Sequence, residues 1–494
     1  MANPLDDPAT TAKYPAMPSP KTLNLANLEA LGAARLAALL LELAQGDALA
    51  KRRLRMELAS ASGGGEDVAQ QVHKRLVAIG KAKAFVDWHK IKPLAHDIDM
   101  QRRAIVDHVA PTDPARAFEL MARLIALARP VYERCDDSNG AIAAIFDSAL
   151  ADLAPLATTA RLPVGTLVDR VFEGVCDNGY GQHDGLIALM APALGDAGLG
   201  QLKARFEALG KTPPVRPPDK ERRVIGYGSG GPMYADELDA RSHARTVHSA
   251  LTDIADALGD VDSFIAQHPA DARRNPAIAA EIAERLLAAG RGDEAMLAIE
   301  AAAATRHKGG YWPDWDRVRI AVLEALGRNE AAQDGRWDLF AAALDENYLR
   351  AYLKRLPDFD DIEAEARAMA HVRAFPSFHH ALHFLVAWPN VEAAAAMVLA
   401  RAAEIDGNHY EVLTPAADAL EQRHPLAATL LLRAMIDFAL EKARHKRYPH
   451  AARHLLSCES LARRIDDFGA HPDHSSYLAT LKTHHGRKSG FWQA

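Results

Sequence analysis

The stretch that decides the fold is PAIAAEIAERLLAAGRGDEAMLAIEAAA, residues 276–303. Its first half consists of small and apolar residues at helical spacing and ends at Gly290-Arg291. Glu294-Ala295 then opens a second stretch of the same kind. A glycine that separates two apolar, helix-periodic stretches predicts two helices joined by a short turn.

The same order of features recurs in WDRVRIAVLEALGRNEAAQDGRWDLF, residues 315–340. The turn glycines Gly290 and Gly327 lie 37 residues apart, near the ~34-residue period of tetratricopeptide repeats. The second turn is one residue shorter, and later helix pairs, over 391–422 and 424–468, are longer and less regular. These stretches predict a tetratricopeptide-like array of antiparallel helix pairs.

Helical patterns also fill the amino-terminal half of the chain. ANLEALGAARLAALLLELA, residues 26–44, places leucines at spacings of three to five, and DPARAFELMARLIALARPVYER, residues 113–134, begins with Asp113-Pro114, a typical helix start. No alternating strand pattern of useful length appears. At 494 residues the chain exceeds one ordinary core. The predicted fold is therefore all-α, an α-α superhelix or solenoid in two lobes.

The composition changes at KTPPVRPPDKERRVIGYGSGGP, residues 211–232, which is rich in proline and glycine. We expect a flexible tail at 1–22, an amino-terminal helical lobe at 23–210, a linker at 211–232 and a carboxy-terminal tetratricopeptide-like lobe at 233–494. Gly226 to Gly231 formally matches G-x-G-x-x-G. A dinucleotide site needs a strand before these glycines and a helix directly after them, whereas Pro232 follows here. We therefore expect a linker and no cofactor.

The composition favours a soluble, cytoplasmic protein. The net charge is −7, hydrophobic residues make up 49% and charged residues 25%. Cys135, Cys176 and Cys458 lie far apart, which suits a reducing compartment and provides neither a disulfide framework nor a zinc ribbon. The first residues lack a signal-peptide pattern, and no apolar run is long enough to span a bilayer.

Several segments together resemble a family of uncharacterised bacterial helical-repeat proteins. They are RLAALLLELAQGDALAKRRLRMELA (35–59), KAFVDW (83–88), ERCDDSNG (133–140), HHALHFLVAWPNVEAAAAMV (379–398), HPLAATLLLRAMIDFAL (424–440), KRYPHAARHLLSC (446–458) and HGRKSGFW (485–492). The resemblance runs from about Leu25 to the end and extends to helical regions that accompany SWIM-type zinc fingers. The C-x-C and C-x-H zinc signature of those proteins is absent here, so no zinc role is implied.

The strongest charge asymmetry lies at the carboxy-terminal end. Residues 441–494 contain ten Lys and Arg against five Asp and Glu, a net charge of +5, which leaves −12 for the rest of the chain. Cations at helix ends and on a solvated face explain part of this excess. A basic patch could also bind an anion, a phosphate or an acidic partner. The candidate anion- or partner-binding residues are Arg444, Lys446, Arg447, His450, Arg453, His454, His484, His485, Arg487 and Lys488.

Histidines raise a second possibility. His379 with His383, and His450 with His454, each share a helical face, but neither pair has the glutamate of a metalloprotease motif. Packing against aromatic residues is the simpler explanation, and we expect no metal. An unrecognised enzyme using His450, His454, His484 and His485 is a further alternative, although no nucleophile pattern supports it.

We therefore expect a non-catalytic scaffold that binds a protein or peptide partner through the basic, His-rich carboxy-terminal face. Binding of nucleic acid or of a phosphate ligand by the same patch is the alternative. The chain ends in THHGRKSGFWQA, and the last helix pair of a solenoid needs a cap. We expect Phe491 and Trp492 to fold back onto the final helices. This would place His484 to Lys488 beside the basic segment at 444–454.

Overall fold

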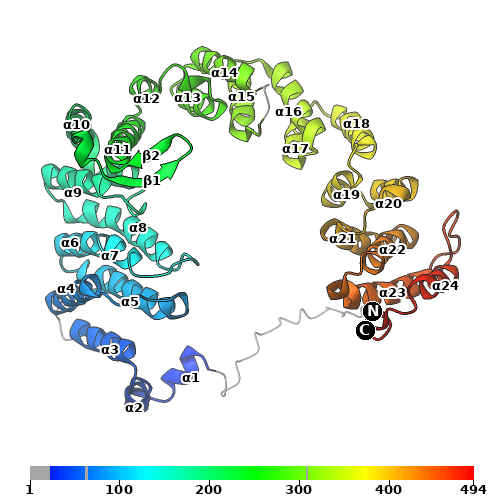
Figure 1. The fold of residues 1–494 in the computed structure, drawn as a ribbon, viewed down its shortest axis with the longest axis horizontal. Coiled ribbons are helices and arrows are strands. Elements are labelled where there is room, and N and C mark those ends of the chain that lie inside the picture. Colours follow the sequence, from blue (N-terminus) through cyan, green and yellow to red (C-terminus); the bar gives the residue numbers. More distant parts are fainter. Residues whose placement is uncertain (1–22, 62–64, 307–309) are drawn as a thin grey trace, which may run out of the picture. The chain divides into compact units, whose positions relative to one another are not determined.

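The computed structural model describes residues 23–61, 65–306 and 310–494, and these residues are overwhelmingly helical (Figure 1). The predicted tail at 1–22 lies outside them. The chain divides into two compact units, 1–268 and 269–494. In each unit, consecutive helices pack side by side as antiparallel pairs. The all-α prediction of a tetratricopeptide-like solenoid is confirmed.

The first unit begins with three helices and continues as packed pairs. Its elements are α1 (Leu25–Glu29), α2 (Ala33–Leu43), α3 (Ala48–Ala61), α4 (Gly65–Lys81), η1 (Trp88–Lys90), α5 (Ile91–Ala104), the π-helical turn η2 (Ile105–Val109), α6 (Pro114–Ile125), α7 (Ala128–Tyr132), α8 (Ala143–Ala160), α9 (Val164–Cys176), α10 (Leu186–Gly210), η3 (Asp219–Glu221), β1 (Val224–Gly228), β2 (Gly231–Tyr234), α11 (Ala235–Ala257) and α12 (Val261–Gln267). Helix α6 packs on α8 and α9 packs on α10. Apolar side chains from α3 to α11 form one continuous core.

The second unit contains the stretch that decides the fold. Its elements are η4 (Ala272–Arg274), α13 (Pro276–Ala288), α14 (Gly292–Arg306), α15 (Pro313–Ala325), α16 (Asn329–Ala343), α17 (Glu346–Leu353), α18 (Asp360–Ala374), α19 (Phe378–Ala387), α20 (Val391–Ala400), η5 (Ala402–Glu404), α21 (Tyr410–Leu420), α22 (Pro425–Glu441), η6 (His445–Arg447), α23 (Tyr448–Ala462), α24 (His474–His485) and α25 (Ser489–Trp492). Helix α13 packs on α14, and α22 packs on both α21 and α23.

The two predicted turns share one hydrogen-bond pattern. Gly290 has a left-handed φ of 75°, and the amide of Arg291 donates to the carbonyl of Leu286 across 2.8 Å. At the second turn Gly327 has a φ of 70°, and Arg328 donates to Leu323 across 2.8 Å. This is the Schellman closure of a helix, which needs a residue that tolerates positive φ. Each of these helix pairs therefore has its glycine at the turn because that residue adopts the positive φ that closes the first helix.

The proline- and glycine-rich segment lies inside the first unit. The division between units falls after His268, and α10 packs along α11 on either side of residues 211–234. Strands β1 and β2 pair as an antiparallel hairpin, with Gly228 opposite Gly231 and Tyr227 opposite Pro232. Neither strand was predicted from the sequence, because both are very short and the glycines allow a tight turn instead of a long alternating pattern.

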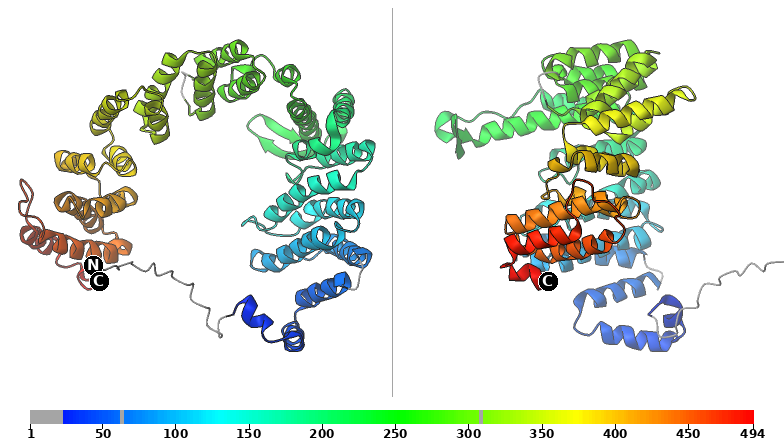
Figure 2. Two further views of the ribbon diagram at one scale, coloured as in Figure 1. Left: turned by 180° about the vertical axis from the view of Figure 1, so that it is seen from behind. Right: turned by 90° about the vertical axis from the view of Figure 1, so that its right-hand side faces the viewer.

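The hairpin stands on a charged clamp at its base. Nε of Arg222 donates to both carboxylate oxygens of Asp236 across 3.1 Å, and Nη2 approaches Glu237 to 2.6 Å. The guanidinium also lies over the ring of Tyr234, 3.6 Å from its centroid. The hairpin and the start of α11 extend beyond the helices beside them (right-hand view of Figure 2). The glycines of the G-x-G-x-x-G match lie in this hairpin and not at the start of a helix.

Candidate functional site

The carboxy-terminal tail folds back onto the final helices. Phe491 is 2% exposed, and its ring lies edge-on to that of Tyr448 at the start of α23. Trp492 is partly buried against the same core, and its Nε1 donates to the carbonyl oxygen of His485 across 2.9 Å. The expectation that Phe491 and Trp492 close the end of the array is confirmed.

This fold-back brings the two basic stretches together. Nζ of Lys488 donates to the carbonyl oxygen of Leu440 near the end of α22, and Arg444 and Lys446 follow directly after this helix in the chain. The carboxy-terminal end of a helix carries partial negative charge and favours such cations. Arg444, Lys446 and Arg487 are exposed. We call these three residues and Lys488 the basic patch.

Other predicted patch residues are held by neighbours. Arg447 donates to the side-chain oxygen of Asn408 across 3.2 Å and lies 4.5 Å from the ring centroid of Tyr410. Arg453 contacts Nδ1 of His450 across 2.8 Å. Contacts of this kind hold the orientation of both guanidinium groups, so Arg447 and Arg453 are less free to meet a ligand than Arg444 or Arg487.

Neighbouring groups contact the predicted carboxy-terminal histidines. Burial, followed by the charges of His450 and Arg453, lowers the pKa of His454. Nδ1 of His484 lies 3.0 Å from the carbonyl oxygen of Thr480, and burial with nearby Lys488 lowers the pKa of His485. Among the residues that the structure describes, no three His, Cys, Asp or Glu side chains converge as a metal site would require.

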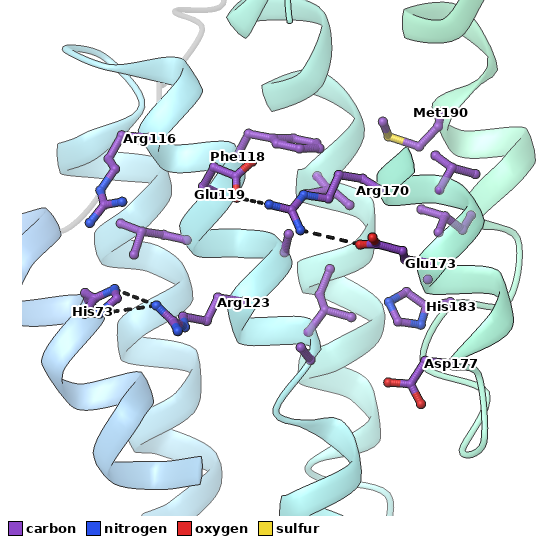
Figure 3. Close-up of a pocket in the computed structure, with 18 residues that line it drawn as sticks. His73, Arg116, Phe118, Glu119, Arg123, Arg170, Glu173, Asp177, His183 and Met190 are labelled. Carbon is purple, nitrogen blue, oxygen red and sulfur yellow. Dashed lines mark hydrogen bonds and ion pairs between the residues drawn. The ribbon is translucent and has the colours of Figure 1, made fainter. Parts of the chain in front are cut away.

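A groove in the first unit presents a richer set of side chains. Its volume is about 470 Å³, within the range of ligand-binding pockets. Helices α4, α6 and α9 contribute its polar side chains, and the loop before α10 closes one end (Figure 3). We call it the α4–α9 groove. Its apolar lining includes Leu120, Leu153, Val171, Leu186 and Met190.

One end of the groove is cationic. Nη1 of Arg123 lies 2.9 Å from Nδ1 of His73, so α6 contacts α4 through two basic groups (Figure 3). Burial, and then the charges of Arg123 and Arg116, lowers the pKa of His73. Within the described residues, neither arginine has a carboxylate close enough for an ion pair. Positive charge at this end is therefore uncompensated.

The other end is acidic. Arg170 on α9 bridges Glu119 on α6, at 2.6 Å, and Glu173 on its own helix, at 3.6 Å. His183 and Asp177 follow at the loop (Figure 3). His183 packs directly on Gly174, where any Cβ would press against its ring, and burial lowers the pKa of His183. The neutral form of His183 is therefore favoured. Asp177 lies 3.8 Å from Arg129, so the carboxylates of Glu119, Glu173 and Asp177 face two arginines, Arg170 and Arg129, and this end keeps an excess of acidic groups.

This groove was not predicted from the sequence. Arg116 and Arg123 are two helical turns apart and share a face, a spacing that is equally common on an ordinary solvated face. The pattern within α6 says nothing about His73 or Glu173, which come from other helices. The groove exists only because three helices pack side by side, and single-helix patterns do not encode which faces become neighbours.

The helices also bear on membrane topology. Within residues 23–61, 65–306 and 310–494, no helix is both long enough and apolar enough to cross a bilayer.

Comparisons with known proteins give a family and little more. A search of curated proteins found no match to the chain. A chain of a solved structure titled "Structure of Naa15/Naa10 bound to HypK-THB" is 14% identical, with a TM-score of 0.31, over 88% of this chain and 68% of that one. A "Circular tandem repeat protein with novel repeat topology and enhanced subunit contact surfaces" is 12% identical, with a TM-score of 0.12, over 94% of this chain and 93% of that one. The profile of a family of unknown function, DUF6880, matches residues 18–494, and the chain therefore belongs to that family.

Proposed function

We propose that the chain is a non-catalytic helical-repeat scaffold that binds an extended peptide segment of a partner protein in the α4–α9 groove. The observation that carries this proposal is the separation of charge along the groove. Arg116 and Arg123 supply positive charge at one end, where no ion pair to a described carboxylate compensates it, and Glu119, Glu173 and Asp177 outnumber their arginine partners Arg170 and Arg129 at the other. A linear ligand with an acidic and a basic side chain matches this arrangement.

The apolar lining between the two ends adds affinity without charge. Leu120, Leu153 and Met190 offer a surface for one apolar side chain of the peptide. Burying such a side chain gives about 1.5–3 kcal/mol, whereas the charged ends mainly set orientation and specificity. The expected peptide therefore carries an acidic, an apolar and a basic residue in that order along the groove.

Affinity capture from the native host tests this function. The wild-type chain should retain a stoichiometric protein that the Arg116→Glu/Arg123→Glu variant loses, because charge reversal repels the acidic residue of the peptide. The control is Arg241→Glu/Arg245→Glu, which reverses two exposed arginines on α11 of the same unit. If both variants capture the same partner as the wild type, the groove is not the binding site.

The basic patch is a second candidate surface, for an acidic partner or the phosphates of nucleic acid. Arg444, Lys446 and Arg487 are exposed and carry like charge, and Lys488 attaches the tail to the carbonyl oxygen of Leu440 on α22. An Arg444→Glu/Arg487→Glu variant should lose any binding of single-stranded RNA or DNA, and binding should weaken steeply as salt rises. Binding that is insensitive to salt and to this variant would exclude a phosphate role.

We place this function in the cytoplasm. Cys135, Cys176 and Cys458 are all free thiols, as is usual in a reducing compartment.

A further inference from the structure

The cationic end of the α4–α9 groove holds two guanidinium groups that no described carboxylate neutralises. Arg116 and Arg123 lie two turns apart on α6, and both line the groove. Within the described residues, the guanidinium of Arg116 makes no hydrogen bond or ion pair, and that of Arg123 contacts only the ring of His73. Most N–H donors of both groups are therefore available to a ligand.

His73 holds Arg123 without neutralising it. Nη1 of Arg123 lies 2.9 Å from Nδ1 of the imidazole and 3.2 Å from Nε2. Burial, and then the charges of Arg123 and Arg116, lowers the pKa of His73, so the neutral ring is favoured at pH 7 and accepts from Arg123 through one nitrogen. A carboxylate in this position would hold the guanidinium and also cancel its charge. The neutral acceptor instead fixes Arg123 and leaves its charge for a ligand.

The acidic side chains beside the two arginines have other partners. Asp113 caps α6 by accepting from the backbone amide of Arg116 across 2.9 Å. Glu119, about one turn from each arginine, pairs with Arg170 on α9 at 2.6 Å. The residues one turn before and after His73 on α4 are uncharged. Among the described residues, the chain therefore supplies no anion to this end of the groove.

The charge at this end matches a phosphate monoester better than a carboxylate. A phosphorylated side chain carries about two negative charges at pH 7 and three acceptor oxygens, so one group can pair with both arginines. A carboxylate carries one charge and would leave one arginine unpaired. Figure 3 shows Arg116 and Arg123 extending toward His73, and after burial their charges lower its pKa. Both guanidinium groups therefore lie near the same ring.

The rest of the groove disfavours a ligand with many phosphates. Glu119, Glu173 and Asp177 outnumber their arginine partners at the other end, and apolar side chains lie between the two ends. A nucleic acid carries a phosphate on every nucleotide and would bring further negative charge to these carboxylates. A peptide can bring one phosphate, then an apolar side chain, then a basic one.

We propose that the cationic end of the α4–α9 groove binds a phosphorylated side chain of the partner peptide, between Arg116 and Arg123. This inference rests on the proposed function and names the acidic residue of that peptide. His73 is a positioning residue, because it orients Arg123 and leaves the phosphate to the two arginines.

Binding of fluorescent peptide pools to the full chain tests the inference. Each pool fixes one central residue, phosphoserine, phosphotyrosine, glutamate or serine, between random positions. One phosphorylated pool should bind at least about tenfold more tightly than the serine pool, because hydrogen bonds to a charged group are the stronger ones. The glutamate pool should fall between them. Arg116→Gln/Arg123→Gln should remove the difference, and Arg241→Gln/Arg245→Gln, at two exposed arginines on α11, is the matched control.

Substitutions of His73 separate positioning from charge. His73→Glu keeps an acceptor beside Arg123 but adds a negative charge, so the preference for phosphate should disappear. His73→Gln keeps a neutral acceptor and should retain most of the preference. A phosphate preference in His73→Glu equal to that of the wild type would overturn the inference.

Phosphatase treatment of the host lysate before affinity capture separates this inference from the proposed function. The captured partner should be lost after dephosphorylation. A partner that is retained after dephosphorylation, yet lost with Arg116→Glu/Arg123→Glu, would leave the scaffold function in place and overturn the phosphate site. Equal binding of the serine and phosphorylated pools would overturn it as well. Single-stranded RNA that binds as tightly as the phosphorylated pools and is lost with Arg116→Gln/Arg123→Gln would assign the site to nucleic acid instead. No captured protein and no binding of any pool would overturn both the inference and the function.

Discussion

The ring of Phe491 lies edge-on to the ring of Tyr448, with 6.4 Å between the ring centroids. Edge-to-face contact at this distance is a favourable arrangement for two aromatic rings. Gly490, directly before Phe491, also lies close to the Tyr448 ring, so a Cβ there would be in van der Waals contact with it. The last residues of the chain therefore complete the core of the second unit.

Removing the Phe491 ring should destabilise the second unit. Phe491→Ala leaves a cavity under α23, and replacing a buried phenylalanine by alanine costs about 3–5 kcal/mol of unfolding free energy. Chemical denaturation measures the loss. Phe359→Ala is the matched control, because Phe359 is 80% exposed and its ring adds little to the core. Equal, small losses in both variants would mean that the tail does not pack in solution.

Gly407 should not tolerate a side chain. A Cβ at this position would collide with the backbone carbonyl of Ala434 on α22, so Gly407→Ala should lower the unfolding free energy by about 1–3 kcal/mol. Gly226→Ala in the hairpin is the control, because no atom lies within 4 Å of a Cβ there. Denaturant midpoints compare the two. A neutral Gly407→Ala would show that the loop before α21 sits farther from α22.

The Arg222 clamp should hold the hairpin in place. Arg222→Ala removes the contacts to Asp236 and Glu237 and the stacking on Tyr234. Because an isolated two-stranded hairpin is marginally stable, backbone amides at 224–234 should then exchange with deuterium much faster. Arg223→Ala replaces the exposed neighbour and should leave their exchange unchanged. Similar exchange rates in the two variants would mean that the hairpin does not depend on the clamp.

Stability should fall on acidification. Burial lowers the pKa of His183, His379 and His454 below the ordinary value of 6.5. The unfolded chain then binds more protons than the folded chain below about pH 6.5, so the unfolding free energy decreases as pH falls from 7 to 5. Denaturation at several pH values measures the slope. Replacing His379 and His454 by Gln should flatten it, whereas an unchanged slope would assign the effect to other groups.

Some of the structure followed from the sequence alone. The positions of Gly290 and Gly327 predicted the turns between α13 and α14 and between α15 and α16, because a Schellman closure needs one residue with positive φ. Asp113-Pro114 predicted the start of α6, where the Asp113 side chain accepts from the amide of Arg116. The closure of the carboxy-terminal end by Phe491 was predicted from an apolar pair at the end of a repeat array.

Other features depended on contacts between distant residues. The boundary after His268 and the hairpin at 224–234 were not predicted, because α10 and α11 pack on each other across the segment that looked like a linker. The α4–α9 groove combines His73, Arg123 and Glu173 from three helices. Local periodicity determined the helices and their turns, since these rest on hydrogen bonds between near neighbours. Only tertiary packing decided which charges meet and which stay unpaired, because that depends on how the helical faces fit together.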